Sequence, residues 1–143
     1  MTDLSKFRLS NVADTCSIWN LLSSLIVWTA ARQQKISVCC TQFVHYECLY
    51  KPGRSRPERI ELQKRLRREI EGGRVRFFNI ELEDLQDIEA LSKRKKVSSG
   101  ELSSMVFAKR TSQAFMSDDA KALKLAATII ANDHIQSTTH LIG

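Results

Sequence analysis

The sequence lacks a cysteine pattern typical of a zinc site, and it lacks a hydrophobic run long enough to cross a membrane. Its four cysteines, Cys16, Cys39, Cys40 and Cys48, do not have zinc-finger spacing, and three of them lie within apolar runs. We therefore expect reduced cysteines in the core of a cytoplasmic protein. The most apolar segment, 17–31, is too short for a membrane span and is interrupted by asparagine and serine. It predicts a buried first helix instead.

The sequence also shows no internal repeat and no sign of a second domain. Its 143 residues predict one domain spanning 1–143, long enough to bury a core. Hydrophobic residues at 43% and charged residues at 27% are typical of a soluble globular protein. The net charge is +6 at pH 7 and the isoelectric point is near 9.4, so we expect an anionic partner, above all nucleic acid.

Short apolar runs alternate with segments of helical periodicity. The runs predict strands at 9–13, 35–40, 75–80 and 114–116, with 140–142 as a candidate last strand. Between them, apolar spacing and capping residues predict helices at 17–31, 42–50, 57–71, 82–91, 101–109 and 118–132. Ser55 is the expected cap of the basic helix, 57–71, which precedes the third predicted strand, and Ser117 is the expected cap of the last helix. Strands that alternate with helices predict an α/β fold with a mainly parallel sheet.

Acidic residues follow several of these predicted strands. Asp14 comes directly after the first apolar run, and Asp118 and Asp119 follow the run 114–116 after one intervening residue. Glu47 lies in the helix after the second strand, and Glu101 lies near a helix start. The carboxyl ends of parallel strands converge on one crevice, so acids far apart in sequence can meet there. Carboxylate oxygens are the ligands that Mg²⁺ prefers. The pattern predicts a metal-dependent nuclease.

Each acid also has a structural explanation. Asp14 could cap the first helix, and Glu101 stands three residues after Ser98, as in a capping box. Asp118 and Asp119 could complement a helix dipole in its first turn. Glu47 could be a solvated helix position.

Four segments carry a resemblance to a known family. They are Val-Ala-Asp-Thr at 12–15, Phe-Val-His-Tyr-Glu at 43–47, Gly-Glu-Leu-Ser at 100–103 and Met-Ser-Asp-Asp-Ala-Lys-Ala at 116–122. In this order and spacing they resemble the PIN-domain nucleases, including the small VapC-type toxins of toxin–antitoxin pairs. The resemblance covers nearly the whole chain.

The resemblance implies a PIN-like three-layer fold, with about four or five parallel strands flanked by helices. It also implies cleavage of RNA with Mg²⁺ or Mn²⁺, an antitoxin that blocks the cleft, and a homodimer with candidate contacts in 21–28. By position, the catalytic, metal-binding acids would be Asp14, Glu47, Glu101 and Asp119. Asp118 could replace or assist Asp119 as a metal ligand, and Ser117 would orient a ligand.

Basic residues crowd the third predicted helix, 57–71, and the segment before it. We expect them to border the acidic cleft and bind RNA phosphates. The alternative is a solvated face with i,i+4 ion pairs. A second basic run, 93–96, is a candidate exposed loop. The candidate RNA-binding residues are Arg54, Arg56, Arg59, Lys64, Arg65, Arg67 and Arg68.

Three rival functions fit parts of the same pattern. The first is a catalytically inactive PIN-like module that binds RNA or protein. The second is a DNA-cleaving relative of the flap nucleases. The third is a receiver-like domain, which would need a phosphoacceptor aspartate at the end of its third strand, where this chain has Asn-Ile-Glu at 79–81.

Overall fold

The computed structural model describes residues 9–51, 56–92 and 97–138. Five strands form one sheet in the order β3-β2-β1-β4-β5, and every neighbouring pair is parallel. The strands are β1 (Ser10–Ala13), β2 (Ser37–Thr41), β3 (Val75–Phe78), β4 (Ala114–Met116) and β5 (Ile135–Gln136). The helices are α1 (Thr15–Ser23), α2 (Leu25–Gln33), α3 (Gln42–Leu49), α4 (Pro57–Glu71), α5 (Leu82–Ser92), α6 (Ser99–Thr111) and α7 (Ala120–Ala126), with a 3-10 turn at Asn132–His134. The predicted α/β class and parallel sheet are confirmed.

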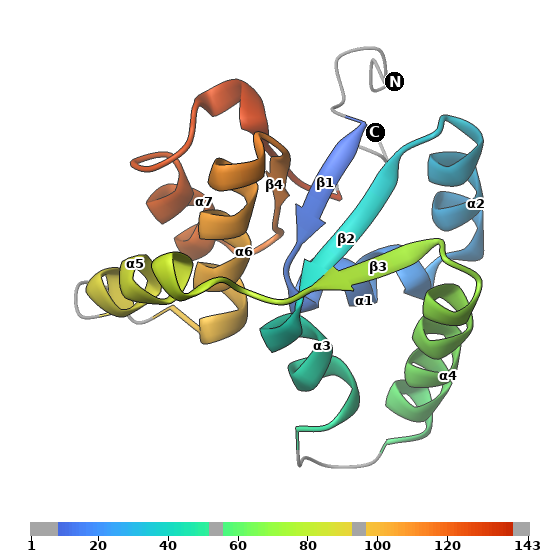
Figure 1. Cartoon of the computed structure of the whole chain (residues 1–143). Coiled ribbons are helices and arrows are strands. Elements are labelled where there is room, and N and C mark those ends of the chain that lie inside the picture. Colours follow the sequence, from blue (N-terminus) through green and yellow to red (C-terminus); the bar gives the residue numbers. More distant parts are fainter. Residues whose placement is uncertain (1–8, 52–55, 93–96, 139–143) are drawn as a thin grey trace.

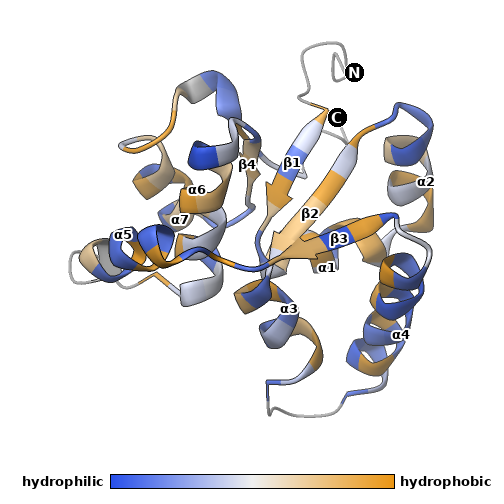
Figure 2. Ribbon diagram, in the orientation of Figure 1, coloured by the Kyte–Doolittle hydropathy of each residue, from blue (hydrophilic) through white to orange (hydrophobic). Residues whose placement is uncertain are grey.

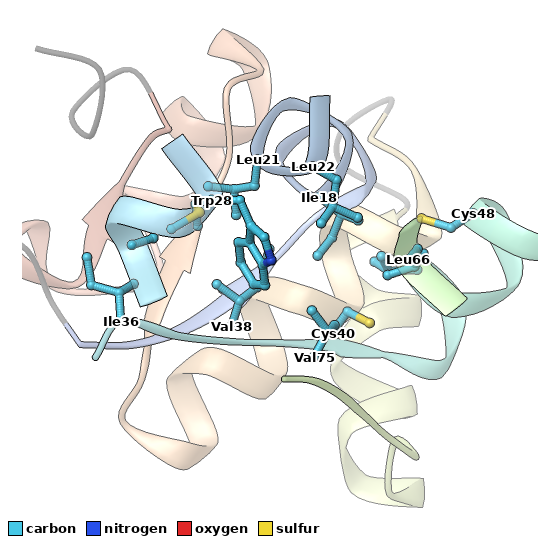
Figure 3. Close-up of a cluster of buried hydrophobic side chains, with 14 of the residues drawn as sticks. Ile18, Leu21, Leu22, Trp28, Ile36, Val38, Cys40, Cys48, Leu66 and Val75 are labelled. Atoms are coloured by element: carbon cyan, nitrogen blue, oxygen red, sulfur yellow. The ribbon is translucent and has the colours of Figure 1, made fainter. Parts of the chain in front are cut away.

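Helices cover both faces of the sheet, so the fold has three layers (Figure 1). Because strand side chains alternate between faces, Val12 and Ala13 belong to two different hydrophobic clusters. One cluster lies under α1, α2 and α4, and Figure 3 shows its buried Trp28 and Leu66 among the strand residues. The other lies under α5, α6 and α7 and contains Phe115, which is fully buried.

The order of the strands reverses between β1 and β4. From β1 the chain adds β2 and β3 on one side, and then returns to add β4 and β5 on the other. Right-handed crossovers place the helices of the two halves on opposite faces of the sheet. We call this point of reversal, between β1 and β4, the switch point. In such sheets ligands bind at the switch point, outside the carboxyl ends of the strands.

The apolar segment 17–31 is not one buried helix, and that prediction is wrong. Ser24 ends α1 and also caps α2, because its hydroxyl accepts a hydrogen bond from a backbone N–H of the next turn. The break turns Leu25 and Ile26 outward, and they are 73% and 83% exposed, whereas Trp28 is buried. Within the described ranges, no helix combines the length and the apolar character needed to cross a membrane.

Two other helix boundaries differ from the predictions. The last helix ends at Ala126, and its N-cap is Asp119 rather than Ser117. The basic helix α4 has Arg56 at its N-cap with no side-chain capping bond, while Ser55 lies outside the described residues. The fifth strand lies at Ile135–Gln136, and the candidate strand at 140–142 also falls outside the described residues.

Candidate functional site

Acidic side chains from four elements meet at the switch point. Asp14 directly follows β1, and Asp119 follows β4 after a short link. Glu47 comes from the second half of α3, and Glu101 from the first turn of α6. The pKa of Glu101 is raised first by desolvation and then by the charges of the other three, so all four lie within electrostatic range of one another. We call these four residues the acidic cluster.

Asp14 is held deep in the protein. Its side chain is 1% exposed, its Oδ1 accepts from the backbone N–H of Ser17 at 3.0 Å, and its Oδ2 accepts from the Ser117 hydroxyl at 2.5 Å. Burial raises the pKa of Asp14, and both hydrogen bonds oppose that shift. Asp14 therefore does cap α1, and it is also fixed from the β4 side of the switch point.

Glu47 is not a solvated helix position. Its Oε2 accepts from the Thr15 hydroxyl at 2.9 Å, and its Oε1 accepts from the backbone N–H of Gly100 at 2.9 Å. A Cβ at residue 100 would collide with Oε1, so only glycine allows this approach. Glu47 thus joins α3 to α1 and α6 at the edge of the site. Thr15 and Gly100 lie inside the segments that resemble the PIN-domain nucleases, but nothing in either segment predicts their contact with Glu47.

Glu101 and Asp119 share a hydrogen bond between their carboxyl groups. The pKa of Glu101 is raised to about 7, by desolvation first and then by the charges of Asp119, Asp14 and Glu47. The repulsion between neighbouring carboxylates disfavours the charged form of Glu101, so this side chain holds its proton part of the time near neutral pH. Asp119 also caps α7 by accepting from the backbone N–H of Lys121 at 2.8 Å.

Asp118 has a different role from its neighbour. Its Oδ1 accepts from the backbone N–H of Thr138 at 2.8 Å, and its Oδ2 accepts from Asn20 at 2.6 Å and from the Thr138 hydroxyl. These bonds tie α1 and the residues after β5 to the link that follows β4. Asp119 is therefore the member of the pair that faces Glu101, and Asp118 holds the surrounding backbone.

Ser117 positions two of the acids at once. It is fully buried, its hydroxyl donates to Asp14, and the same oxygen accepts from the backbone N–H of Asp119 at 3.1 Å. The residue expected to orient a ligand therefore orients Asp14 and the start of the Asp119 cap.

The acidic cluster has the chemistry of a divalent-cation site but not a preformed set of ligands. All four side chains offer hard oxygen donors, which suit Mg²⁺ or Mn²⁺. However, across the described part of the chain no three His, Cys, Asp or Glu side chains are arranged around one point as metal ligands would be. Asp14 and Glu47 instead make hydrogen bonds to the protein, and Glu101 bonds to Asp119. A cation bound here would have to displace the proton that Glu101 holds.

Arg59, a basic residue of α4, contacts the backbone of one member of the acidic cluster. Its guanidinium donates to the backbone carbonyl of Glu47 at 3.2 Å. Arg65 instead donates to the carbonyl of Leu22 at 2.8 Å and pairs with Glu61 at 3.4 Å, so its role is structural.

The remaining candidates lie mostly on the outer face of α4, which Figure 2 shows as largely hydrophilic. Arg56, Lys64, Arg67 and Arg68 are exposed there. Arg54 and the basic run 93–96 lie outside the described residues.

The expectation that all four cysteines lie in the core is wrong for Cys16. All four thiols are free, and Cys39, Cys40 and Cys48 are buried, but Cys16 is exposed beside the acidic cluster. The pKa of the Cys16 thiol is raised by desolvation first and then by the nearby carboxylates, beginning with Asp14.

Comparison with known proteins adds no relative. No protein-family model matches the chain, and neither does any curated protein. The likeness to PIN-domain nucleases therefore stands on the four short segments and on where the fold places their acids.

Proposed function

We propose that the protein is a Mg²⁺- or Mn²⁺-dependent ribonuclease whose active site is the acidic cluster. One observation carries the proposal: Asp14, Glu47, Glu101 and Asp119 come from four separate elements, and the charges of the other three add to desolvation in raising the pKa of Glu101 to about 7. Carboxylates that repel one another cost folding free energy. A bound divalent cation would replace this repulsion between carboxylates by attraction to the metal. Cation binding therefore accounts for four acids close together, which helix capping alone does not explain.

Glu101 and Asp119 would hold the cation, because their mutual hydrogen bond is the one a metal can replace. Asp14 and Glu47 would add negative charge from positions fixed by Ser117 and Gly100. When bound, the metal lowers the pKa of an attacking water and neutralises charge that develops at the phosphate. The protein's own contribution is to keep the four acids aligned and to place the Arg59 guanidinium beside them.

Two observations support RNA and protein partners. The chain carries a net charge of +6, and Arg56, Arg67 and Arg68 are exposed on α4, the helix that also carries Arg59, so an anionic strand is attracted to this helix. The choice of RNA, and of an antitoxin that inhibits the enzyme, follows from the PIN resemblance. For a homodimer, the exposed Leu25 and Ile26 offer an apolar contact.

The second candidate function is an inactive PIN-like module that binds RNA or protein. It is favoured by one observation, that the described acids are hydrogen-bonded to the protein or to each other rather than arranged as metal ligands.

The test is cleavage of a mixed pool of single-stranded RNA and tRNA with Mg²⁺ or Mn²⁺. Wild type is compared with Asp119→Asn and Glu101→Gln, and with Asp87→Asn as a control, because Asp87 is an exposed acid on α5. We expect cleavage that requires metal, is lost in both site variants and survives in the control. Calorimetric titration with Mn²⁺ provides a readout independent of activity. A folded wild type that neither cleaves RNA nor binds Mn²⁺ would establish the inactive module instead.

A further inference from the structure

We infer that exposed aromatic rings on α3 and β3 form a stacking surface for the bases of single-stranded RNA, next to the acidic cluster. This inference rests on the proposed function for the choice of RNA. The surface, which we call the aromatic platform, consists of His45, Tyr46, Tyr50 and Phe77.

The rings of the platform are partly organised already. His45 stacks on Phe77 with ring centroids 3.9 Å apart and an angle of 10° between the planes, and Tyr50 meets His45 edge-on at 5.4 Å. Much of this aromatic surface remains in water: Phe77 is 41% exposed, Tyr46 51% and Tyr50 61%. Flat rings that are held in place but left open are suited to stacking on nucleic-acid bases.

The edge of the sheet keeps Phe77 turned outward. β3 is one of the two edge strands of the described sheet, and of its four residues Val75 is buried while the other three are exposed. The next residue after Phe77, Phe78, stacks on Phe107 of α6 with centroids 5.5 Å apart. Because successive strand side chains point to opposite faces, this contact fixes Phe77 on the side of α3.

Positive charge borders the rings, as a strand with phosphates requires. Arg67 on α4 is close enough to His45 to contribute, after burial, to lowering the pKa of the imidazole. Arg67 is itself exposed, and Arg59 on the same helix donates to the backbone carbonyl of Glu47. Aromatic faces and guanidinium groups therefore occur together on this surface. A protein partner would need acidic groups to match them.

The platform is continuous with the acidic cluster. His45, Tyr46 and Glu47 are consecutive on α3, where each residue is rotated by about 100° from the one before. Tyr46 therefore lies on the helix surface between the ring that stacks on Phe77 and the carboxylate that contacts Gly100. A strand whose bases stack on the platform is led past Tyr46 towards the acids. Bases inside a duplex are already stacked and paired, so the platform selects single strands.

The test is the affinity of the full chain for a fluorescent single-stranded RNA of about 12 nucleotides, measured by anisotropy in EDTA so that no cleavage occurs. We expect Tyr50→Leu and Phe77→Leu each to weaken binding about 10-fold, and Tyr50→Phe, which keeps the ring, to bind like wild type. The same strand annealed to its complement should bind more weakly. Tyr50 ends α3 and is largely exposed, so its replacement does not threaten the fold.

Salt dependence separates stacking from charge. Tyr50→Leu should leave the slope of log affinity against log salt unchanged, whereas Arg67→Gln should reduce it by about 0.7. The inference is overturned if folded Tyr50→Leu binds like wild type, or if duplex RNA binds as tightly as the single strand. Cleavage of the same RNA with Mg²⁺ is scored separately. If the protein cleaves RNA but the ring variants do not change binding, the aromatic platform is wrong and the nuclease proposal stands. If binding depends on the rings but no cleavage occurs, the platform stands and the nuclease proposal is wrong.

Discussion

Replacing Glu101 by glutamine should make the metal-free protein more stable at pH 8. The substitution keeps the shape of the side chain and removes a charge that faces Asp119, Asp14 and Glu47. Glutamine has nearly the same shape as glutamate but no charge to be repelled, so the substitution should stabilise the native state even though it removes a proposed metal ligand. The prediction therefore tests the electrostatics of the acidic cluster without any assumption about catalysis.

The size of the effect follows from the pKa of Glu101, which is raised from 4.5 to about 7 in the native state. For an acid shifted upward, the native state holds the proton more tightly, so stability is fully present below pH 4.5 and falls as the pH rises to about 7. Without screening the loss would be roughly 3 kcal/mol. Glu101 is only half-buried, so we expect solvent to reduce it to about 1–2 kcal/mol. The variant avoids this loss at pH 8, and the difference should vanish by pH 4.

The assay is urea unfolding followed by circular dichroism at pH 8 and pH 4 in EDTA. Glu58→Gln is the matched control, because Glu58 also lies in the first turn of a helix and its replacement reports the lost dipole interaction alone. The reasoning is refuted if Glu101→Gln lowers the free energy of unfolding at pH 8, or if its effect is the same at both pH values. If the cluster binds Mg²⁺, adding the ion to wild type should narrow the difference between the two proteins.

Three further outcomes are expected. Asp118→Ala should lower the free energy of unfolding by about 2 kcal/mol in urea titrations, because it leaves the backbone N–H of buried Thr138 without its acceptor, and an unchanged midpoint would contradict the structural role. Cys16 should react slowly with a disulfide reagent at pH 8, since desolvation and then the nearby carboxylates raise the pKa of its thiol. Asp119→Asn should speed this reaction, and equal rates in the variant and wild type would show that the charge of Asp119 does not reach the thiol. Ile26→Arg should leave the melting temperature unchanged, because this side chain is 83% exposed, and convert a dimer to a monomer in light scattering. A wild type that is already monomeric at high concentration would remove the dimer proposal.

Local sequence signals determined where most elements lie. Ser98 caps α6 as the capping-box pattern predicts, and Thr41 caps α3 in the same way, because a cap needs only a side-chain oxygen and a backbone N–H three residues later. The two wrong helix predictions, 17–31 and 118–132, also have local causes. At Ser24 a cap signal inside an apolar stretch outweighed continuous hydrophobicity, and after Ala126 the β-branched residues 128–130 did not continue the helix.

Which acids meet was decided by the tertiary structure. Asp118 and Asp119 are adjacent and chemically identical, so no sequence pattern separates them. Asp118 is directed to Asn20, 98 residues away, while Asp119 is paired with Glu101. The resemblance could name the candidates, but only the reversal of strand order brings β1 and β4 together and gives each carboxylate its partner.

The same holds for the surface around the site. Sequence composition predicted a basic helix, yet only packing shows that Arg59 reaches Glu47 while Arg65 turns to Leu22. The stacking of His45 on Phe77 joins two residues of different elements, and nothing in either segment alone predicts it. The sequence by itself determined the elements, the charge and the candidate acids, because these depend on neighbours along the chain. The tertiary structure decided their pairing, because parallel strands place distant residues side by side.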